Sequence, residues 1–282
     1  MKRQIFDILV KLVDGTTINK EEEALLKIEG YFDNNQITDK AIKALEPYKV
    51  KNAIIMAAGF GSRMAPLTLT TPKPLVSVNG TRFIDTLIGE LVRNDIKEIY
   101  IVRGYLKEKF DILLDKYPFI KFLDNDLYDK ENNISSIMKA VDIIGNTYIC
   151  EADLLITGSD VIKKYQYECN YIGSRVKETD DWCYDVDSNN RIYNYRKGGT
   201  NCVQAYGISY WDNESSKVLR RCLKEMYSIE ENKKEFWEMC VFDKYKELFD
   251  IKFRPVDPAS IVEIDTLEEL VAKDSSYSNL LK

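Results

Sequence analysis

Residues 52–75 read NAIIMAAGFGSRMAPLTLTTPKPL, and this stretch indicates the fold more clearly than any other part of the chain. It begins with an apolar run that is typical of a buried strand and continues into an irregular loop with two glycines. Arg63 and Lys73 lie in this loop, and a proline stands on each side of the lysine. Glycines let backbone N–H groups approach a polyphosphate, and two cations can neutralise its charge. The stretch therefore predicts a strand followed by a polyphosphate-binding loop.

The composition limits the chemistry and the setting. The chain has 282 residues, a net charge of −6 and no histidine, so its chemistry must use carboxylates, lysine, arginine, thiols, hydroxyls or a metal. The six cysteines lie far apart without a CxxC pair, which predicts free thiols in a reducing compartment and argues against a zinc site. No apolar run reaches the ~20 residues of a membrane span, and the amphipathic start argues against a signal peptide. We expect a cytoplasmic protein without a membrane partner.

Strand-like and helix-like segments alternate from residue 51 onward, which predicts a mostly parallel sheet flanked by helices. Strands are expected at 53–58, 98–102, 119–123 and 147–153, with helices near 83–92, 106–116 and 134–144. Ligands of such sheets gather at the carboxyl ends of the strands, where the glycine loop and Asp153 both fall. The prediction is a Rossmann-like α/β domain over residues 49–282.

The pattern changes to antiparallel strands after residue 168. Turns are expected at Asp180-Asp181, Asn189-Asn190 and Gly198-Gly199, followed by helices over 213–227 and 232–249. Two closing strands, IKFRPV and IVEID, complete the chain. We expect this smaller antiparallel part, about residues 169–262, to bind an acceptor.

Residues 1–48 precede the alternating strands and helices, and we expect them to form a separate appendage. Helices over 3–13, after Asn19 and over 38–45, with a small hairpin at YFDNNQI, are similar to a winged helix-turn-helix. The segment holds seven Lys/Arg against nine Asp/Glu, and DNA binding requires cations that face phosphates. We therefore expect a packing or oligomerisation role and no nucleic-acid partner, and the sequence leaves a homo-oligomer open.

Several separated motifs resemble one enzyme family. The loop AAGFGSR…TPKPL lacks the third glycine of the dinucleotide fingerprint and the GK[ST] of a Walker motif, and it resembles the signature of sugar-phosphate nucleotidyltransferases. From about Asn52 to Lys273, the chain most closely resembles bacterial CTP:phosphocholine cytidylyltransferases. The motifs that carry this resemblance are VRGYLKEKF, NNISS, EADLL, GISYWD, EFWE and EID.

The resemblance implies a transfer in which an acceptor phosphate oxygen attacks the α-phosphorus of CTP and pyrophosphate leaves. Such a reaction needs positioning and charge neutralisation and no protein nucleophile, which suits a chain without histidine. By the resemblance, Arg63 holds the leaving phosphates and Lys73 bridges the α-phosphate and the acceptor phosphate. Asp153 and Asp265 would hold Mg²⁺, a cofactor that prefers carboxylates and phosphate oxygens, and Glu263 would lie beside them.

The resemblance also assigns the ligand contacts. The nucleotide would contact the loop and two later motifs, at Ala57, Ala58, Gly59, Gly61, Ser62, Tyr105, Asn133 and Ser135. Asn133 and Ser135 have a second interpretation as helix caps, and the two roles are compatible. Aromatic faces with a nearby acid recognise quaternary ammonium ions. The acceptor group would contact Trp182, Tyr184, Lys197, Phe236, Trp237, Glu238 and Glu263.

The resulting hypothesis is a Mg²⁺-dependent cytidylyltransferase that makes CDP-choline and pyrophosphate from CTP and phosphocholine. The chain has FWE where the family often has YWD, which leaves the acceptor open to phosphoethanolamine or 2-aminoethylphosphonate. A sugar-1-phosphate nucleotidyltransferase is the other enzymatic alternative. From a different class, the alternative is a regulatory protein that senses a nucleotide.

Overall fold

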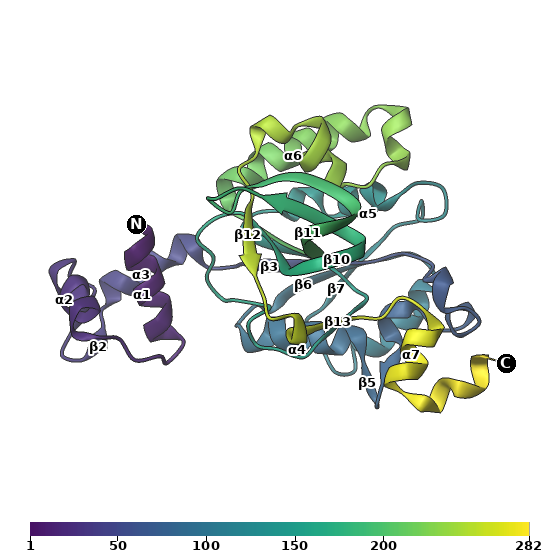
Figure 1. The fold of residues 1–282 in the computed structure, drawn as a ribbon, viewed down its shortest axis with the longest axis horizontal. Helices are drawn as coiled ribbons and strands as arrows, with labels where there is room; N and C mark the ends of the chain where they lie inside the picture. The colour runs from purple at the N-terminus through teal and green to yellow at the C-terminus, as the bar shows by residue number, and fades with distance from the viewer. Residues whose placement is uncertain (282) are drawn as a thin grey trace. The chain divides into compact units, whose positions relative to one another are not determined.

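The computed structural model describes residues 1–281, which fall into two units (Figure 1). The first comprises Met1–Val50 together with Lys164–Tyr167, and the second comprises Lys51–Lys163 and the chain from Glu168 onward. The expected boundary after residue 48 thus moves to residue 50, and a short later segment joins the first unit.

The first unit has the predicted order of helix, helix, hairpin and helix. Its elements are α1 (Arg3–Val13), α2 (Lys20–Ile28), β1 (Phe32–Asp33), β2 (Gln36–Ile37) and α3 (Asp39–Leu45). Asn19 caps α2 as expected, because its side chain accepts hydrogen bonds from the N–H groups of Glu21 and Glu22. Rings from the two chain segments pack together, since Tyr48 stacks on Tyr167 with centroids 5.4 Å apart.

The second unit is built on a seven-stranded sheet with the order β12-β10-β11-β8-β3-β6-β7. The strands are β3 (Asn52–Ala57), β6 (Glu98–Arg103), β7 (Lys121–Asp124), β8 (Thr147–Glu151), β10 (Asn170–Val186), β11 (Ile192–Trp211) and β12 (Lys252–Pro255). Strands β8, β3, β6 and β7 are parallel, whereas β11 is antiparallel to both of its neighbours. The predicted mainly parallel α/β fold is confirmed.

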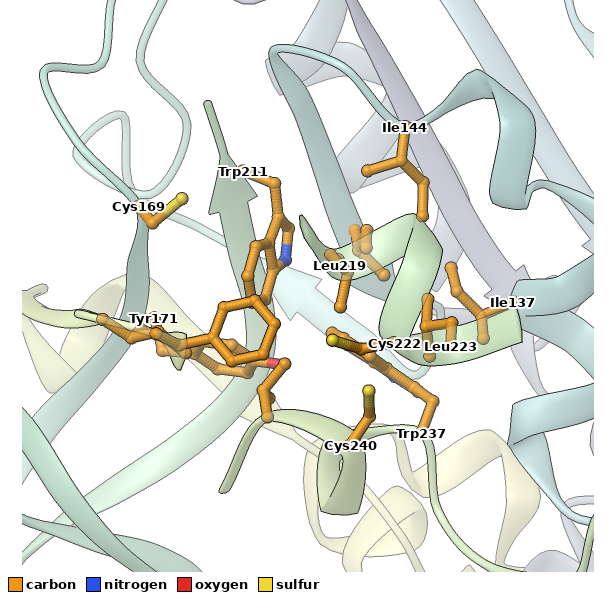
Figure 2. Close-up of a cluster of buried hydrophobic side chains, with 14 of the residues drawn as sticks. Ile137, Ile144, Cys169, Tyr171, Trp211, Leu219, Cys222, Leu223, Trp237 and Cys240 are labelled. Atoms are coloured by element: carbon orange, nitrogen blue, oxygen red, sulfur yellow. The ribbon is translucent and has the colours of Figure 1, made fainter. Parts of the chain in front are cut away.

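Helices cover both faces of this sheet (Figure 1). The covering helices are α4 (Phe83–Arg93), α5 (Asn133–Lys139) and α6 (Asn213–Tyr227). Helix α7 (Leu267–Lys273) lies to the side and packs with Val78 and Phe83. Two small ribbons, β4 (Ser77–Val78) with β5 (Thr81–Arg82) and β9 (Leu154–Ile156) with β13 (Ile261–Glu263), lie outside the main sheet. Figure 2 shows the core between the sheet and α6, where Leu219 and Leu223 approach Trp211 and Trp237.

Two expected turns and three expected helices differ from the structure. The turns at Asp180-Asp181 and Gly198-Gly199 are wrong, because both pairs lie inside the continuous strands β10 and β11. Register shifts between these strands let them curl without ending, and only the turn at Asn189-Asn190 separates them. The helix expected over 232–249 is short 3₁₀ and π turns at 230–234, 240–244 and 246–248, and that over 106–116 is a 3₁₀ turn at 107–113. The helix expected over 134–144 ends at Lys139, and a 3₁₀ turn follows it.

Candidate active site

Two adjoining cavities open at the carboxyl ends of the parallel strands in the second unit. The smaller, of about 280 Å³, is lined by the glycine loop, Arg63, Lys73, Asp153 and Asp265. The larger, of about 530 Å³, extends from Ala58 and Gly59 toward the curled β10–β11 ribbon and residues 236–238. Arg63, Glu151 and Asp153 line both cavities, so the two spaces share one wall.

Lys73 lies at the base of the smaller cavity and is only 7% exposed. Its Nζ is 2.9 Å from an Asp153 oxygen and 2.5 Å from an Asp265 oxygen. Burial opposes the charge of the lysine, but the two carboxylates outweigh it and raise the pKa of Lys73. Lys73 therefore stays a cation inside the protein.

The glycine loop packs directly on Lys73. Gly61 has a φ of +61°, and a Cβ built there would lie 2.8 Å from the Cβ of Lys73. Any other residue would clash with the lysine and strain the backbone. Ser62 and Arg63 begin the short 3₁₀ turn that follows, and an Arg63 nitrogen lies 2.9 Å from an Asp265 oxygen. Asp265 is thus paired with both cations.

Asp265 also belongs to a group of acids that comes from distant parts of the chain. Carboxylate oxygens of Asp181, Glu263 and Asp265 lie within 4.8 Å of one another. One Glu263 oxygen is buried and has no hydrogen-bond partner among the described residues. Burial and the charges of Asp153, Asp181 and Asp265 raise the pKa of Glu263 to about 8. A divalent cation would relieve this repulsion, so the donor set fits Mg²⁺, with Asp181 as a member that the sequence did not indicate.

The larger cavity has an aromatic wall. Trp182 stacks on Tyr195 with centroids 4.9 Å apart and an interplanar angle of 9°. Phe236 and Trp182 form a T-shaped pair with centroids 5.7 Å apart, and all three rings line the cavity together with Lys197. Tyr195 was not predicted, although strands that turn at Asn189-Asn190 would place it across from residue 184 and diagonal to Trp182.

Acids line the same cavity without a cation paired to them. Glu151, Glu238 and Glu263 form no ion pair with any described residue. Burial raises the pKa of Glu238 to about 7, and burial with neighbouring acids raises the pKa of Glu151 well above its ordinary value. Glu151 fits because Gly207 faces it in the left-handed conformation, where a Cβ would lie 2.2 Å from the Glu151 side chain.

Two of the predicted acceptor residues lie in the core instead of the cavity. Tyr184 is fully buried, and its hydroxyl donates a hydrogen bond to the Tyr171 carbonyl at 3.2 Å. Trp237 is 2% exposed and packs against Tyr171 and Trp211 (Figure 2). Its neighbours Phe236 and Glu238 line the cavity while the indole points into the core.

The predicted nucleotide-binding residues also divide into those that line the cavities and those whose side chains contact other parts of the protein. Ala57, Ala58, Gly59, Gly61 and Ser62 line the cavities, so they are placed where a ligand can reach them. Other predicted side chains are already engaged in the protein. Ser135 is buried and donates to the Asn132 carbonyl at 2.8 Å, and the Tyr105 ring packs on Phe60 with centroids 5.1 Å apart.

Asn133 lines the larger cavity, and both ends of its amide have protein partners. Its oxygen accepts from the Trp237 N–H at 2.8 Å, and its nitrogen donates to a Glu238 carboxylate oxygen at 3.3 Å. Asn133 is therefore the first residue of α5 and at the same time links this helix to residues 237 and 238.

Comparison with known proteins agrees with the geometry. A family model described as nucleotidyl transferase matches residues 52–181. A 2-aminoethylphosphonate cytidylyltransferase of Lancefieldella rimae is 42% identical over 234 residues, which cover 82% of this chain and 95% of the relative. A choline-phosphate cytidylyltransferase of Haemophilus influenzae is 30% identical and covers 77% of this chain and 94% of the relative. The solved CTP:phosphocholine cytidylyltransferase of Streptococcus pneumoniae superposes with a TM-score of 0.73 and 29% identity, over 83% of this chain and all of that one.

Proposed function

The chain belongs to the nucleotidyl transferase family, and we propose that it transfers the cytidylyl group of CTP to 2-aminoethylphosphonate, with release of pyrophosphate. The observation that carries the acceptor is the set of carboxylates in the larger cavity that have no cationic partner among the described residues. An acceptor that brings both a phosphorus oxyanion and an ammonium group would supply the missing cation. The relative that is 42% identical carries the same acceptor in its name.

The smaller cavity supplies what the transfer needs at phosphorus. An oxygen of the acceptor phosphonate attacks the α-phosphorus, and the bond from that phosphorus to the bridging oxygen of the β-phosphate breaks. Arg63 has a side chain that is 66% exposed, and it would turn from its ion pair with Asp265 toward the phosphates that leave. Lys73 is fixed by its burial and its two carboxylates, so it offers a preorganised charge to the α-phosphate and the attacking oxygen.

We assign Mg²⁺ to Asp153 and Asp265, with Glu263 and Asp181 next to Asp265. The repulsion among these acids and the unpartnered Glu263 oxygen support this assignment. When bound, the ion would neutralise phosphate charge as the α-phosphorus is transferred. The charges of Lys73 and Arg63 hold Asp265 in place in the protein itself.

The ammonium end of the acceptor would lie in the larger cavity. A primary ammonium has three N–H donors and is best satisfied by acceptors such as the Glu238 and Glu151 carboxylates. The faces of the Trp182, Tyr195 and Phe236 rings also suit a cation, and this aromatic wall favours phosphocholine as the second candidate. The choline-phosphate relatives at 30% identity support the same second candidate.

A test with four acceptors separates these proposals. Purified protein would be incubated with CTP and Mg²⁺ plus 2-aminoethylphosphonate, phosphocholine, phosphoethanolamine or glucose 1-phosphate, and pyrophosphate release would be followed. We expect the highest kcat/KM with 2-aminoethylphosphonate and loss of release when Mg²⁺ is chelated. A higher kcat/KM with phosphocholine would transfer the proposal to that acceptor. Absence of release with all four would contradict both candidates.

A further inference from the structure

Two loops that are far apart in sequence are tied together beside the larger cavity. The Asn132 N–H donates to the Lys233 carbonyl at 2.9 Å, and the Asn132 side chain donates to the Lys234 carbonyl at 3.0 Å. Asn133 continues this contact to Trp237 and Glu238. The start of α5 thus fixes the backbone of the segment 233–238 that carries Phe236 and Glu238 into the cavity.

The contact partners determine how the Asn133 amide is oriented. The backbone N–H of Trp237 can only donate, so the atom of Asn133 that faces it must be the oxygen. The amide nitrogen then points to the Glu238 carboxylate, which can accept this bond when ionised. One amide thus binds both the Trp237 backbone and the Glu238 carboxylate, which ties the Glu238 side chain to the start of α5.

From this geometry we infer that Asn133 is a positioning residue that orients Glu238 toward the acceptor ammonium, and that its effect falls on the acceptor and not on CTP. This inference rests on the proposed function, because it takes the larger cavity to be the acceptor site. Glu238 is 6% exposed and forms no ion pair with a described residue. Its own backbone, Asn133 and Trp237 supply hydrogen bonds to its carboxylate, and of these the Asn133 amide is the one that reaches it from α5.

The sharpest variant is Asn133→Asp. Aspartate has the same shape, still accepts from the Trp237 N–H, and is favoured in the first turn of a helix, so α5 should form normally. It loses the donor to Glu238 and places a second carboxylate against it. We expect the KM for 2-aminoethylphosphonate to rise about 10- to 100-fold, the range for losing a hydrogen bond to a charged group. The KM for CTP should change less than about twofold.

Asn132→Asp is the matched control. It removes a side-chain donor from the same loop to the same segment, at the Lys234 carbonyl, and keeps the oxygen that accepts from the Asn133 N–H. The acceptor KM of this variant should rise much less than that of Asn133→Asp. Equal rises in the two variants would show a general loosening of the segment and would contradict the specific role of Asn133.

A double-variant comparison then tests whether Asn133 acts through Glu238. In a Glu238→Gln background, Asn133→Asp should raise the acceptor KM by less than about threefold, because the carboxylate it positions is gone. Full additivity of the two changes, or a rise in the KM for CTP in place of the acceptor KM, would overturn the inference. If Asn133→Asp does not fold, Asn133→Ala removes both hydrogen bonds without adding charge and should show the same split between the two KM values.

Failure of the proposed function would be visible separately. If the wild-type protein turns over phosphocholine and not 2-aminoethylphosphonate, the same variants are measured with phosphocholine. The split between acceptor KM and CTP KM then decides the role of Asn133, whichever acceptor the enzyme uses.

Discussion

The two cavities of the active site differ in how their charges are balanced. In the smaller cavity, Asp265 is paired with Lys73 and Arg63, and Asp153 is paired with Lys73. In the larger cavity, Glu151, Glu238 and Glu263 have raised pKa values and no paired cation in the described part of the chain. The acids of the smaller cavity are therefore neutralised by cations of the protein, whereas these three acids of the larger cavity have no paired cation, although Lys197 also lines that cavity.

The largest effect is expected when Lys73, the cation paired with both Asp153 and Asp265, is removed. Lys73→Ala should lower kcat/KM about 10²- to 10³-fold, because a preorganised charge at the reacting phosphorus is lost. Pyrophosphate release measures it, and Lys109→Ala, an exposed lysine after β6, is the control. Circular dichroism would show that the variant is folded. Full turnover by the folded variant would remove Lys73 from the mechanism and with it the contrast between the cavities.

The second prediction concerns the unpaired acid Glu238. Because its pKa is raised from 4.5 to about 7, the folded protein binds this proton more tightly than the unfolded chain does. The free energy of unfolding should therefore fall as pH rises from about 4.5 to about 7, and Glu238→Gln should remove this contribution. The difference between the two proteins should change by at most about 3 kcal/mol over that range.

Urea unfolding at about pH 5 and about pH 8 measures this change in the absence of substrates. The substitution Glu238→Gln keeps the size of the side chain, so packing contributes little to the comparison. Parallel curves for the two proteins would mean that Glu238 already has a stabilising partner, and the larger cavity would then be as balanced as the smaller one.

Trp182→Ala addresses the aromatic wall of the larger cavity. Loss of a cation–π contact should raise the acceptor KM about 2- to 30-fold and leave the KM for CTP unchanged. Tyr193→Ala on the same strand pair, where the ring is 63% exposed and outside the two cavities, is the control. Equal effects on both KM values would show that the ribbon affects the whole site and not the acceptor alone.

The smallest effect is expected on the nucleotide side. The Tyr105 hydroxyl has one long contact, 3.4 Å from the Leu69 carbonyl, and its ring packs on Phe60. Tyr105→Phe should therefore change the KM for CTP less than about twofold. A rise of tenfold or more would restore the phenol as a nucleotide contact, as the sequence suggested.

These comparisons also show what the sequence can reveal. The smaller cavity could be predicted because Gly59 to Lys73 form one contiguous motif, and Asp153 and Asp265 follow recognisable strands. The mainly parallel sheet could be predicted from the alternation of apolar runs. The larger cavity could be predicted only in part, because Asp181 and Tyr195 reach it through a ribbon whose curl depends on register shifts between the paired strands β10 and β11.

The wrong turns and the two misplaced aromatic residues also result from tertiary structure that the local sequence does not show. Acids and glycines at 180–181 and 198–199 are typical of turns, but the long paired strands absorb them as irregularities. Tyr184 and Trp237 have the right chemistry for an ammonium ion, yet tertiary packing assigns them to the core. Residue type alone cannot distinguish a cage aromatic from a core aromatic in a chain with 11% aromatic residues.

The first unit has a consequence for anyone who shortens this protein. Because Lys164–Tyr167 belongs to it, a truncation before residue 51 would remove its helices and leave Tyr165 and Tyr167 behind. Tyr167 would lose the rings of Phe6 and Tyr48, and its hydroxyl would lose the Met1 carbonyl. The shortened chain would expose aromatic side chains that are partly buried in the full chain, and exposed apolar surface promotes aggregation. Poor solubility of such a fragment would therefore result from the truncation and would not measure the stability of the second unit.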